Sequence, residues 1–142
     1  MKYLLDTDHI SILQRRAGPE FAALSGRIAK QSPADLAFSL VSFHEQVVGA
    51  HTYINRARST SDVARGYALL EEILQAFAVA VVLPFDAAAG AVFDGLIAQR
   101  IRIATMDLRI AAIALSRNMV LLTRNVRDFA LVPGLVTEDW TV

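Results

Sequence analysis

The chain contains no cysteine among its 142 residues and only two lysines, Lys2 and Lys30. The lack of cysteine excludes disulfide bonds and thiolate metal sites, which suits a reducing compartment such as the cytoplasm. No apolar stretch approaches the ~20 residues of a membrane span, because VAVVLPF is broken by Pro84 and followed by Asp86. The opening MKYLL is also too short for the apolar core of a secretory signal. We therefore expect a cytoplasmic protein that does not enter a membrane.

A net charge is lacking as well, because fourteen basic and fourteen acidic residues cancel. This balance argues against a non-specific nucleic-acid binder, which is normally strongly basic. Twelve of the basic residues are arginines, and some fall close together, as Arg124 and Arg127 do. Arginine binds phosphate through paired hydrogen bonds, but such groups are also typical of solvated surfaces. Charge alone therefore does not identify a nucleic-acid surface.

The residues that are present predict one α/β domain over residues 1–142. The chain is 54% hydrophobic and shows no internal repeat or low-complexity linker. Short apolar or β-branched runs predict strands at KYLLD (2–6), DLAFSL (35–40), VAVVLPF (79–85), VLLT (120–123) and LVTEDW (135–140). Apolar residues at helical spacing predict helices over about 8–14, 19–28, 43–54, 63–77, 86–100 and 107–115, with a short turn or helix at 124–129. This alternation predicts a parallel sheet covered by helices on both faces.

Four acids are expected near the carboxyl ends of these strands, where open parallel sheets bind their ligands. Asp6 closes the first strand, and Glu45 lies in the helix after the second. Asp107 opens the helix before the fourth strand, and Asp128 follows that strand. Clustered carboxylates repel one another, so a site built from them needs a hard divalent cation such as Mg²⁺ or Mn²⁺. Two such ions can activate a water and hold a phosphodiester, which favours hydrolysis of nucleic acid.

Most of these acids also have an ordinary explanation, because a carboxylate at a helix start satisfies free backbone N–H groups. Asp8 and Asp107 both lie at predicted helix starts. Asp6 differs from them, because Thr7 or Asp8 can cap the first helix without it. We therefore interpret Asp6 as functional and Asp8 as a cap or an outer partner of the site. His9, the next residue, is interpreted as an exposed helix residue.

Phosphoryl transfer to aspartate is the rival chemistry for this stretch. The spacing of Asp6 and Asp8 resembles the first motif of haloacid-dehalogenase phosphatases, and a strand-ending aspartate resembles receiver domains. Both families use a lysine from a later strand end, and neither Lys2 nor Lys30 follows a later strand. The phosphatase reading therefore ranks behind a site built on metal ligands alone.

Four blocks of the sequence together resemble a PIN-domain ribonuclease, specifically a VapC-type toxin of a toxin–antitoxin pair. They are LLDTDHIS (4–11), VSFHEQVVGA (41–50), MDLRIAAIAL (106–115) and LLTRNVRDFALVPGLVTEDW (121–140). The resemblance extends from end to end of the chain. Its most specific part is an aspartate opening an Ile-Ala-Ala helix, followed by a Thr-x-Asn-x-x-Asp-Phe segment.

The resemblance implies a three-layer α/β/α fold with strand order 3-2-1-4-5 and a Mg²⁺- or Mn²⁺-dependent endoribonuclease. Asp6 and Asp107 then correspond to the principal metal-binding acids, and Glu45 and Asp128 complete the quartet. Many PIN domains place the last acid where this chain has Asn125, so the fourth position remains open between Asn125 and Asp128. Supporting or substrate-binding roles are implied for Thr123, Asn125 and Arg124.

The resemblance also implies partners: an RNA substrate, a second copy of the chain in a homodimer, and a VapB-like antitoxin whose carboxyl-terminal segment enters the acidic site. The alternative from another class is a non-catalytic PIN-like module that binds RNA or protein.

Overall fold

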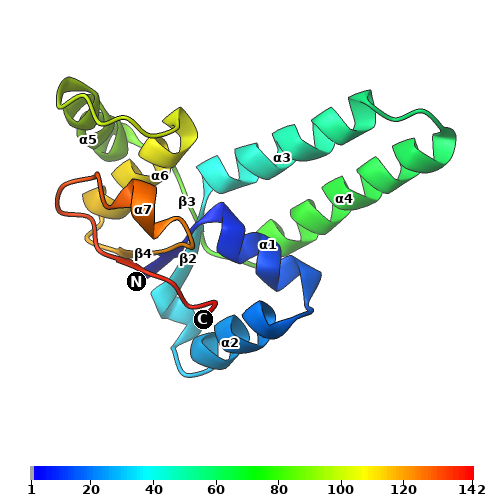
Figure 1. Ribbon diagram of the computed structural model, residues 1–142, viewed down its shortest axis with the longest axis horizontal. Helices are drawn as coiled ribbons and strands as arrows, with labels where there is room; N and C mark the ends of the chain where they lie inside the picture. The colour runs from blue at the N-terminus through cyan, green and yellow to red at the C-terminus, as the bar shows by residue number, and fades with distance from the viewer. Residues whose placement is uncertain (1) are drawn as a thin grey trace.

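The computed structural model describes residues 2–142, in which strands and helices alternate along the chain (Figure 1). The strands are β1 (Tyr3–Leu5), β2 (Leu36–Ser39), β3 (Val82–Leu83), β4 (Val120–Leu122) and β5 (Thr137–Glu138). The helices are α1 (Thr7–Arg15), α2 (Pro19–Ile28), the 3₁₀ helix η1 (Pro33–Asp35), α3 (Leu40–Asn55), α4 (Thr60–Ala78), α5 (Ala87–Ala98), α6 (Thr105–Ser116) and α7 (Val126–Phe129). All five predicted strands are present, so the α/β prediction is confirmed.

The five strands form one parallel sheet in the order β3-β2-β1-β4-β5. Leu4 at the centre of β1 pairs with Ala37 on one side and with Leu121 on the other. The order 3-2-1-4-5 is therefore confirmed. It brings the carboxyl ends of β2, β1 and β4 side by side, because all strands run in the same direction.

Alternate residues of each strand face opposite sides of the sheet and build two separate cores. Leu4 and Leu121 belong to a core that is covered by α5, α6 and α7. Leu5 and Leu122 belong to the other core, which is covered by α1, α2, α3 and α4. Burial on both faces explains why these strands read as continuous apolar runs in the sequence.

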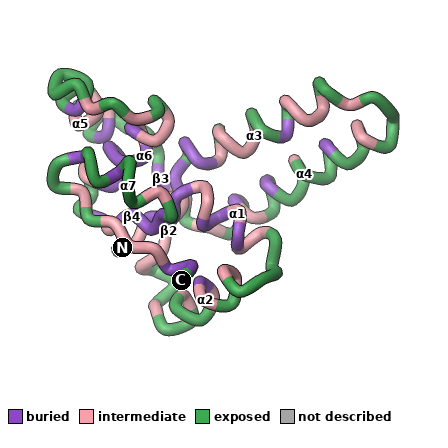
Figure 2. Tube along the Cα trace, in the orientation of Figure 1, coloured by how far each residue is buried: buried purple, intermediate pink, exposed green. Residues whose placement is uncertain are grey.

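Helices α3 and α4 form a long antiparallel hairpin that extends away from the sheet (Figure 1). Its outer half is mostly exposed or half-buried, whereas the half next to the sheet carries the buried positions Val41 and Phe77 (Figure 2). Most of the hairpin's contribution to the core therefore comes from its inner half, although Ala50 farther along α3 is also buried.

Several predicted boundaries differ from the observed ones by a few residues, and two of these differences have clear local reasons. The strand expected over 79–85 is reduced to β3, because Val79 terminates α4 and Pro84 has no N–H to extend the ladder. Helix α4 starts three residues earlier than predicted, because the Ser59 hydroxyl accepts a hydrogen bond from the Asp62 amide at 3.1 Å. The remaining strands are found within their predicted ranges.

Among residues 2–142, no helix has both the length and the apolar composition that crossing a membrane requires.

Gly66 allows α3 and α4 to approach closely in the hairpin. A Cβ at this position would lie 2.3 Å from Cγ1 of Ile54 and 3.2 Å from the ring of Tyr53. We expect Gly66→Ala to lower the free energy of unfolding by about 1–3 kcal/mol through overpacking, measured by urea denaturation. Gly95→Ala in α5 is the matched control, because its Cβ would meet no atom within 4 Å and alanine favours the helix. A Gly66→Ala protein as stable as the Gly95→Ala protein would contradict this account.

Candidate metal centre

Asp6 follows β1 directly and is held on both sides by its neighbours. Its amide donates to the Leu122 carbonyl at 2.9 Å, which continues the β1–β4 ladder by one residue. Its carboxylate Oδ1 accepts a hydrogen bond from the Thr7 amide at 2.8 Å, so Asp6 is itself the N-cap of α1. The expectation that Thr7 or Asp8 supplies this cap is wrong, because α1 begins immediately after the strand. Asp6 is only 5% exposed.

Glu45 and Asp107 come from two helices that begin at the same edge of the sheet. Glu45 lies near the start of α3, and its Oε1 accepts a hydrogen bond from Thr7 Oγ1 at 2.9 Å. The buried Ser42 hydroxyl lies 2.9 Å from the same Thr7 oxygen. Asp107 lies in the first turn of α6, whose N-cap Ala104 has no capping side chain. Within residues 2–142, no side chain forms a hydrogen bond with the Asp107 carboxylate, so this carboxylate is available for a ligand.

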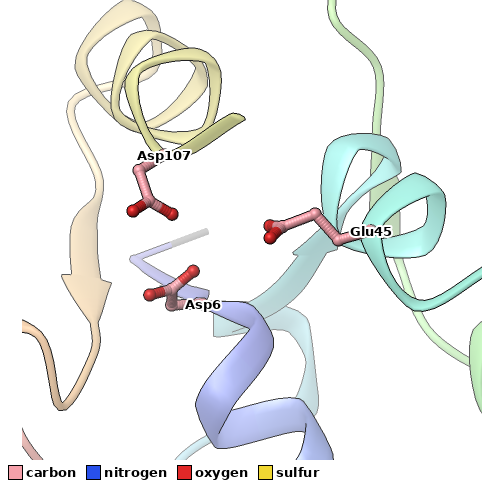
Figure 3. Close-up of side chains that lie close together, drawn as sticks. All are labelled: Asp6, Glu45 and Asp107. Atoms are coloured by element: carbon pink, nitrogen blue, oxygen red, sulfur yellow. The ribbon is translucent and has the colours of Figure 1, made fainter. Parts of the chain in front are cut away.

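The three carboxylates of Asp6, Glu45 and Asp107 converge on one point (Figure 3). One oxygen from each lies within 4.8 Å of the other two. Within residues 2–142, none of the three forms an ion pair with lysine or arginine. Three converging carboxylate oxygens without a balancing side-chain cation are the ligand set that hard divalent ions prefer. The residues present therefore fit a metal site.

The electrostatics of the cluster also favour a bound cation. Burial raises the pKa of Asp6 to about 7, and the negative charge of Asp8 is the next largest cause. Burial and then the charge of Glu45 raise the pKa of Asp107 to about 6. A bound cation would relieve this repulsion and return both carboxyls to their ionised forms.

Asp128 and Asn125 lie at the edge of this cluster. Asp128 is exposed on α7 and accepts a hydrogen bond from the Asn125 side-chain amide at 3.1 Å. It is not among the carboxylates that lie within 4.8 Å of one another, although its charge contributes to the raised pKa of Asp107. The structure thus brings three of the four predicted acids together and places the fourth beside them, joined to Asn125.

Thr123 and Arg124 connect the end of β4 to the cluster. The buried Thr123 hydroxyl donates to Asp6 Oδ2 at 2.8 Å and accepts a hydrogen bond from the Asn125 backbone amide at 3.0 Å. The Arg124 backbone amide donates to Asp8 Oδ2 at 2.9 Å. The Arg124 residue is exposed, so its guanidinium remains accessible to a phosphate.

The interpretation of His9 as an exposed helix residue is wrong. His9 is completely buried, and its ring bonds to Asp8 on one side and to the Trp140 backbone on the other. A sequence signal for this burial did exist, because His9 precedes the buried Ile12 by three positions on the inner face of α1. Asp8 is not a cap, and it lies as an outer partner between His9 and Arg124.

Comparison with proteins of known sequence gave full-length relatives, although no protein-family model matches the chain. The chain is 33% identical over 145 residues to ribonuclease VapC1 of Haemophilus influenzae strain R2866, covering 99% of both chains. The same values hold for ribonuclease VapC1 of H. influenzae strain 86-028NP.

Comparison with solved structures gave proteins of similar fold over nearly the whole chain. VapBC-1 of nontypeable H. influenzae superimposes with a TM-score of 0.69 at 27% identity, covering 100% of both chains. VapBC of Salmonella typhimurium gives 0.72 at 24% identity, covering 99% of this chain and 98% of that one. FitAcB of Neisseria gonorrhoeae gives 0.70 at 23% identity, covering 99% of both.

A parallel sheet of order 3-2-1-4-5 that carries acids at the ends of its central strands is the architecture of PIN-domain nucleases. The full-length relatives narrow this class further. The chain belongs to the VapC family, the ribonuclease toxins of VapBC toxin–antitoxin systems. The VapC family and the ribonuclease activity expected from the resemblance are therefore confirmed.

Proposed function

We propose that the chain is a Mg²⁺- or Mn²⁺-dependent endoribonuclease whose metal is held by Asp6, Glu45 and Asp107, with Asp128 completing the quartet. The observation that carries this proposal is the convergence of the three carboxylates within 4.8 Å. Ribonuclease is the activity named for the two Haemophilus relatives. Oxygen ligands without histidine or cysteine favour Mg²⁺ or Mn²⁺ over zinc.

The residues of the cluster have separate tasks in this proposal. A divalent ion, when bound, supplies Lewis acidity to the scissile phosphate and lowers the pKa of the attacking water. Asp6 Oδ1 and Oδ2 each accept one hydrogen bond from the protein, so each oxygen keeps a lone pair for the ion. The Thr7 hydroxyl orients Glu45 in the same way. Cleavage by water leaves a 5′-phosphate and a 3′-hydroxyl.

Supporting roles follow from the contacts around the cluster. Asn125 orients Asp128 through its side-chain amide, and Thr123 orients Asp6. The exposed Arg124 guanidinium, two positions before Val126 in the loop to α7, is placed to contact an RNA phosphate. Because Asp128 lies beside the cluster, we propose that it contacts the central ion only through water or binds a second ion.

The proposal is tested by incubating the purified protein with structured RNAs in the presence of Mg²⁺, Mn²⁺ or a chelator. Cleavage is expected with either ion and is expected to stop on chelation, with 5′-phosphorylated products. Cleavage that persists with the chelator would refute the metal assignment. Failure to cleave any RNA, together with retained binding, would favour the alternative of a non-catalytic PIN-like binding module.

The antitoxin partner is supported by the solved neighbours, which include a VapBC complex and a toxin–antitoxin complex from Klebsiella pneumoniae. We propose a VapB-like antitoxin whose carboxyl-terminal segment enters the acidic site, where an arginine would replace the charge of the metal. We propose that this segment also occupies two cavities beside α1 and α4, both of which are lined by Gln14 and Glu72. The larger measures about 450 Å³ and includes Ile10, Leu13 and Phe38. A groove lined largely by apolar side chains fits the apolar face of an amphipathic segment.

Leu69, which lines the smaller cavity and is 37% exposed, tests this mode of binding. We expect Leu69→Glu to weaken antitoxin binding at least about tenfold, measured by calorimetry, because it places a charge in the apolar groove. Leu131→Glu is the matched control, since Leu131 is 56% exposed and lies outside both cavities. Equal weakening by the two substitutions would argue against binding in this groove.

The remaining assignments rest on the family likeness. We propose that residues 1–142 form a single PIN domain that acts in the cytoplasm as a homodimer, and that it joins a larger complex when the antitoxin binds. Sedimentation of the free protein and of the complex distinguishes these states.

A further inference from the structure

His9 is a polar side chain with no exposed surface, wedged between the first turn of α1 and the carboxyl-terminal segment after β5. Its Nδ1 lies 2.7 Å from Asp8 Oδ1, and its Nε2 lies 3.2 Å from the Trp140 backbone nitrogen. A buried imidazole whose two nitrogens both have partners is a specific structural feature, because an unmatched buried polar group is costly.

The partners determine which nitrogen of His9 carries the proton. The Trp140 backbone N–H can only donate, so Nε2 presents a lone pair to it, whereas Asp139 Oδ1 at 3.8 Å lies beyond hydrogen-bond distance of Nε2. The proton of the ring then resides on Nδ1, and Nδ1–H donates to the Asp8 carboxylate. The contact with Trp140 thus selects the tautomer, and this tautomer makes His9 a hydrogen-bond donor to Asp8.

Asp8 passes this orientation on to the metal centre. While its Oδ1 is held by His9, its Oδ2 accepts the Arg124 amide at 2.9 Å and lies 3.4 Å from the Thr123 hydroxyl. Thr123 in turn donates to Asp6 Oδ2 at 2.8 Å. One continuous series of contacts therefore connects His9 to the carboxylate at the centre of the site.

We propose that His9 is a positioning residue for RNA cleavage: through Asp8 it holds the loop after β4 so that Thr123 keeps Asp6 oriented toward the metal. This proposal rests on the proposed metal-dependent function. His9 itself has no exposed surface and is not among the converging ligands, so it would contact neither the ion nor the RNA. Its effect is transmitted because Asp8 bridges α1 and the loop after β4, where it accepts the Arg124 amide and lies next to the Thr123 hydroxyl. A group that hydrogen-bonds directly to a metal ligand, as Thr123 does to Asp6, typically alters metal affinity by 10- to 100-fold, and His9 acts on this contact.

A purely structural role is the competing explanation, since His9 also anchors Trp140, which packs on Tyr3 with ring centroids 4.6 Å apart. The two halves of the imidazole can be separated by substitution. The side-chain amide of asparagine reproduces the donor at Nδ1, whereas the side-chain oxygen of glutamine reaches the position of the acceptor at Nε2. His9→Asn thus keeps the bond to Asp8 and loses the bond to Trp140, and His9→Gln does the reverse.

The test measures direct Mn²⁺ binding by electron paramagnetic resonance, together with kcat and KM for RNA, on folded protein of each variant. We expect His9→Gln to weaken Mn²⁺ binding about 10- to 100-fold and to lower kcat with little change in KM. His9→Asn is expected to keep Mn²⁺ affinity within about threefold of the wild type. We expect this even if its unfolding temperature falls as far as that of His9→Gln. Equal Mn²⁺ affinities in the two variants, or a larger loss in His9→Asn, would overturn the proposal.

Two further measurements keep the result unambiguous. Asp6→Asn is measured in parallel, because wild-type protein that binds no more Mn²⁺ than Asp6→Asn would refute the metal site itself and not the role of His9. The ¹⁵N shifts of the His9 ring in the wild type need no variant to fold. A proton on Nδ1 is expected, and a proton found on Nε2 alone would overturn the proposal.

Discussion

Asparagine at position 6 is expected to lower kcat for RNA cleavage by at least roughly 10³-fold, because it removes the charge from the most buried of the converging ligands. Asp107→Asn is expected to have a comparable effect, since Asp107 is the second acid whose pKa the cluster raises. Asp128→Asn, at the edge of the site, should cost only about tenfold. Single-turnover cleavage of one RNA at saturating Mn²⁺ ranks the three variants.

Asp62→Asn is the matched control for this series. Asp62 lies in the first turn of α4, at the end of the α3–α4 hairpin that is farthest from the sheet (Figure 1). Its substitution is expected to leave kcat unchanged. Retention of more than a tenth of the wild-type rate by Asp6→Asn would contradict the assignment of Asp6 as a central ligand, and an Asp128→Asn protein as impaired as Asp6→Asn would move Asp128 to the centre.

The metal-free protein is expected to become less stable as the pH rises from about 4 to about 7. Burial, followed by the charge of Asp8, raises the pKa of Asp6 from 3.8 to about 7, so the folded state holds a proton that the unfolded state has lost. Stability is therefore greatest below the unfolded pKa and is lost through the folded one. For Asp6 the loss at pH 8 is on the order of 4 kcal/mol. The raised pKa of Asp107 acts in the same direction and over a similar window.

Chemical denaturation at pH 5 and pH 8, with a chelator, measures this effect. Mn²⁺ is expected to restore stability at pH 8 more than at pH 5, because the ion binds the ionised carboxylates of the folded state. Asp6→Asn should remove much of the pH dependence and should be more stable than the wild type at pH 8 without metal. Stability of the metal-free wild type that rises between pH 5 and pH 8 would show that the cluster does not carry these raised pKa values.

The fold was largely predictable because parallel strands buried on both faces need apolar residues at every position. Leu4 and Leu5 belong to different cores, yet both are required, and the same holds for Leu121 and Leu122. Such runs stand out from the helical spacing of their neighbours. The end of β3 at Pro84 was less visible, because strand length depends on which amides find partners in the sheet.

The candidate site was predictable in its acids and not in their connections. Asp6 stood out as a carboxylate that directly follows a buried strand, and the structure gives it the additional task of capping α1. The burial of His9 was misjudged: its spacing from Ile12 indicated the inner face of α1, but the segment that covers it lies far away in the sequence. The bond to Trp140, 131 positions away, exists only in the folded chain.

By itself, then, the sequence determined the α/β class, the likeness to VapC toxins and the acids Asp6, Glu45, Asp107 and Asp128 as candidates. These features follow from residue type and spacing, which act over short range. The tertiary structure decided which of the acids meet within 4.8 Å, that Asp128 stands beside them, and that His9 and Asp8 connect the carboxyl-terminal segment to the site. Distances between residues far apart in the chain are set by the packing of the helices on the sheet, which no local pattern specifies.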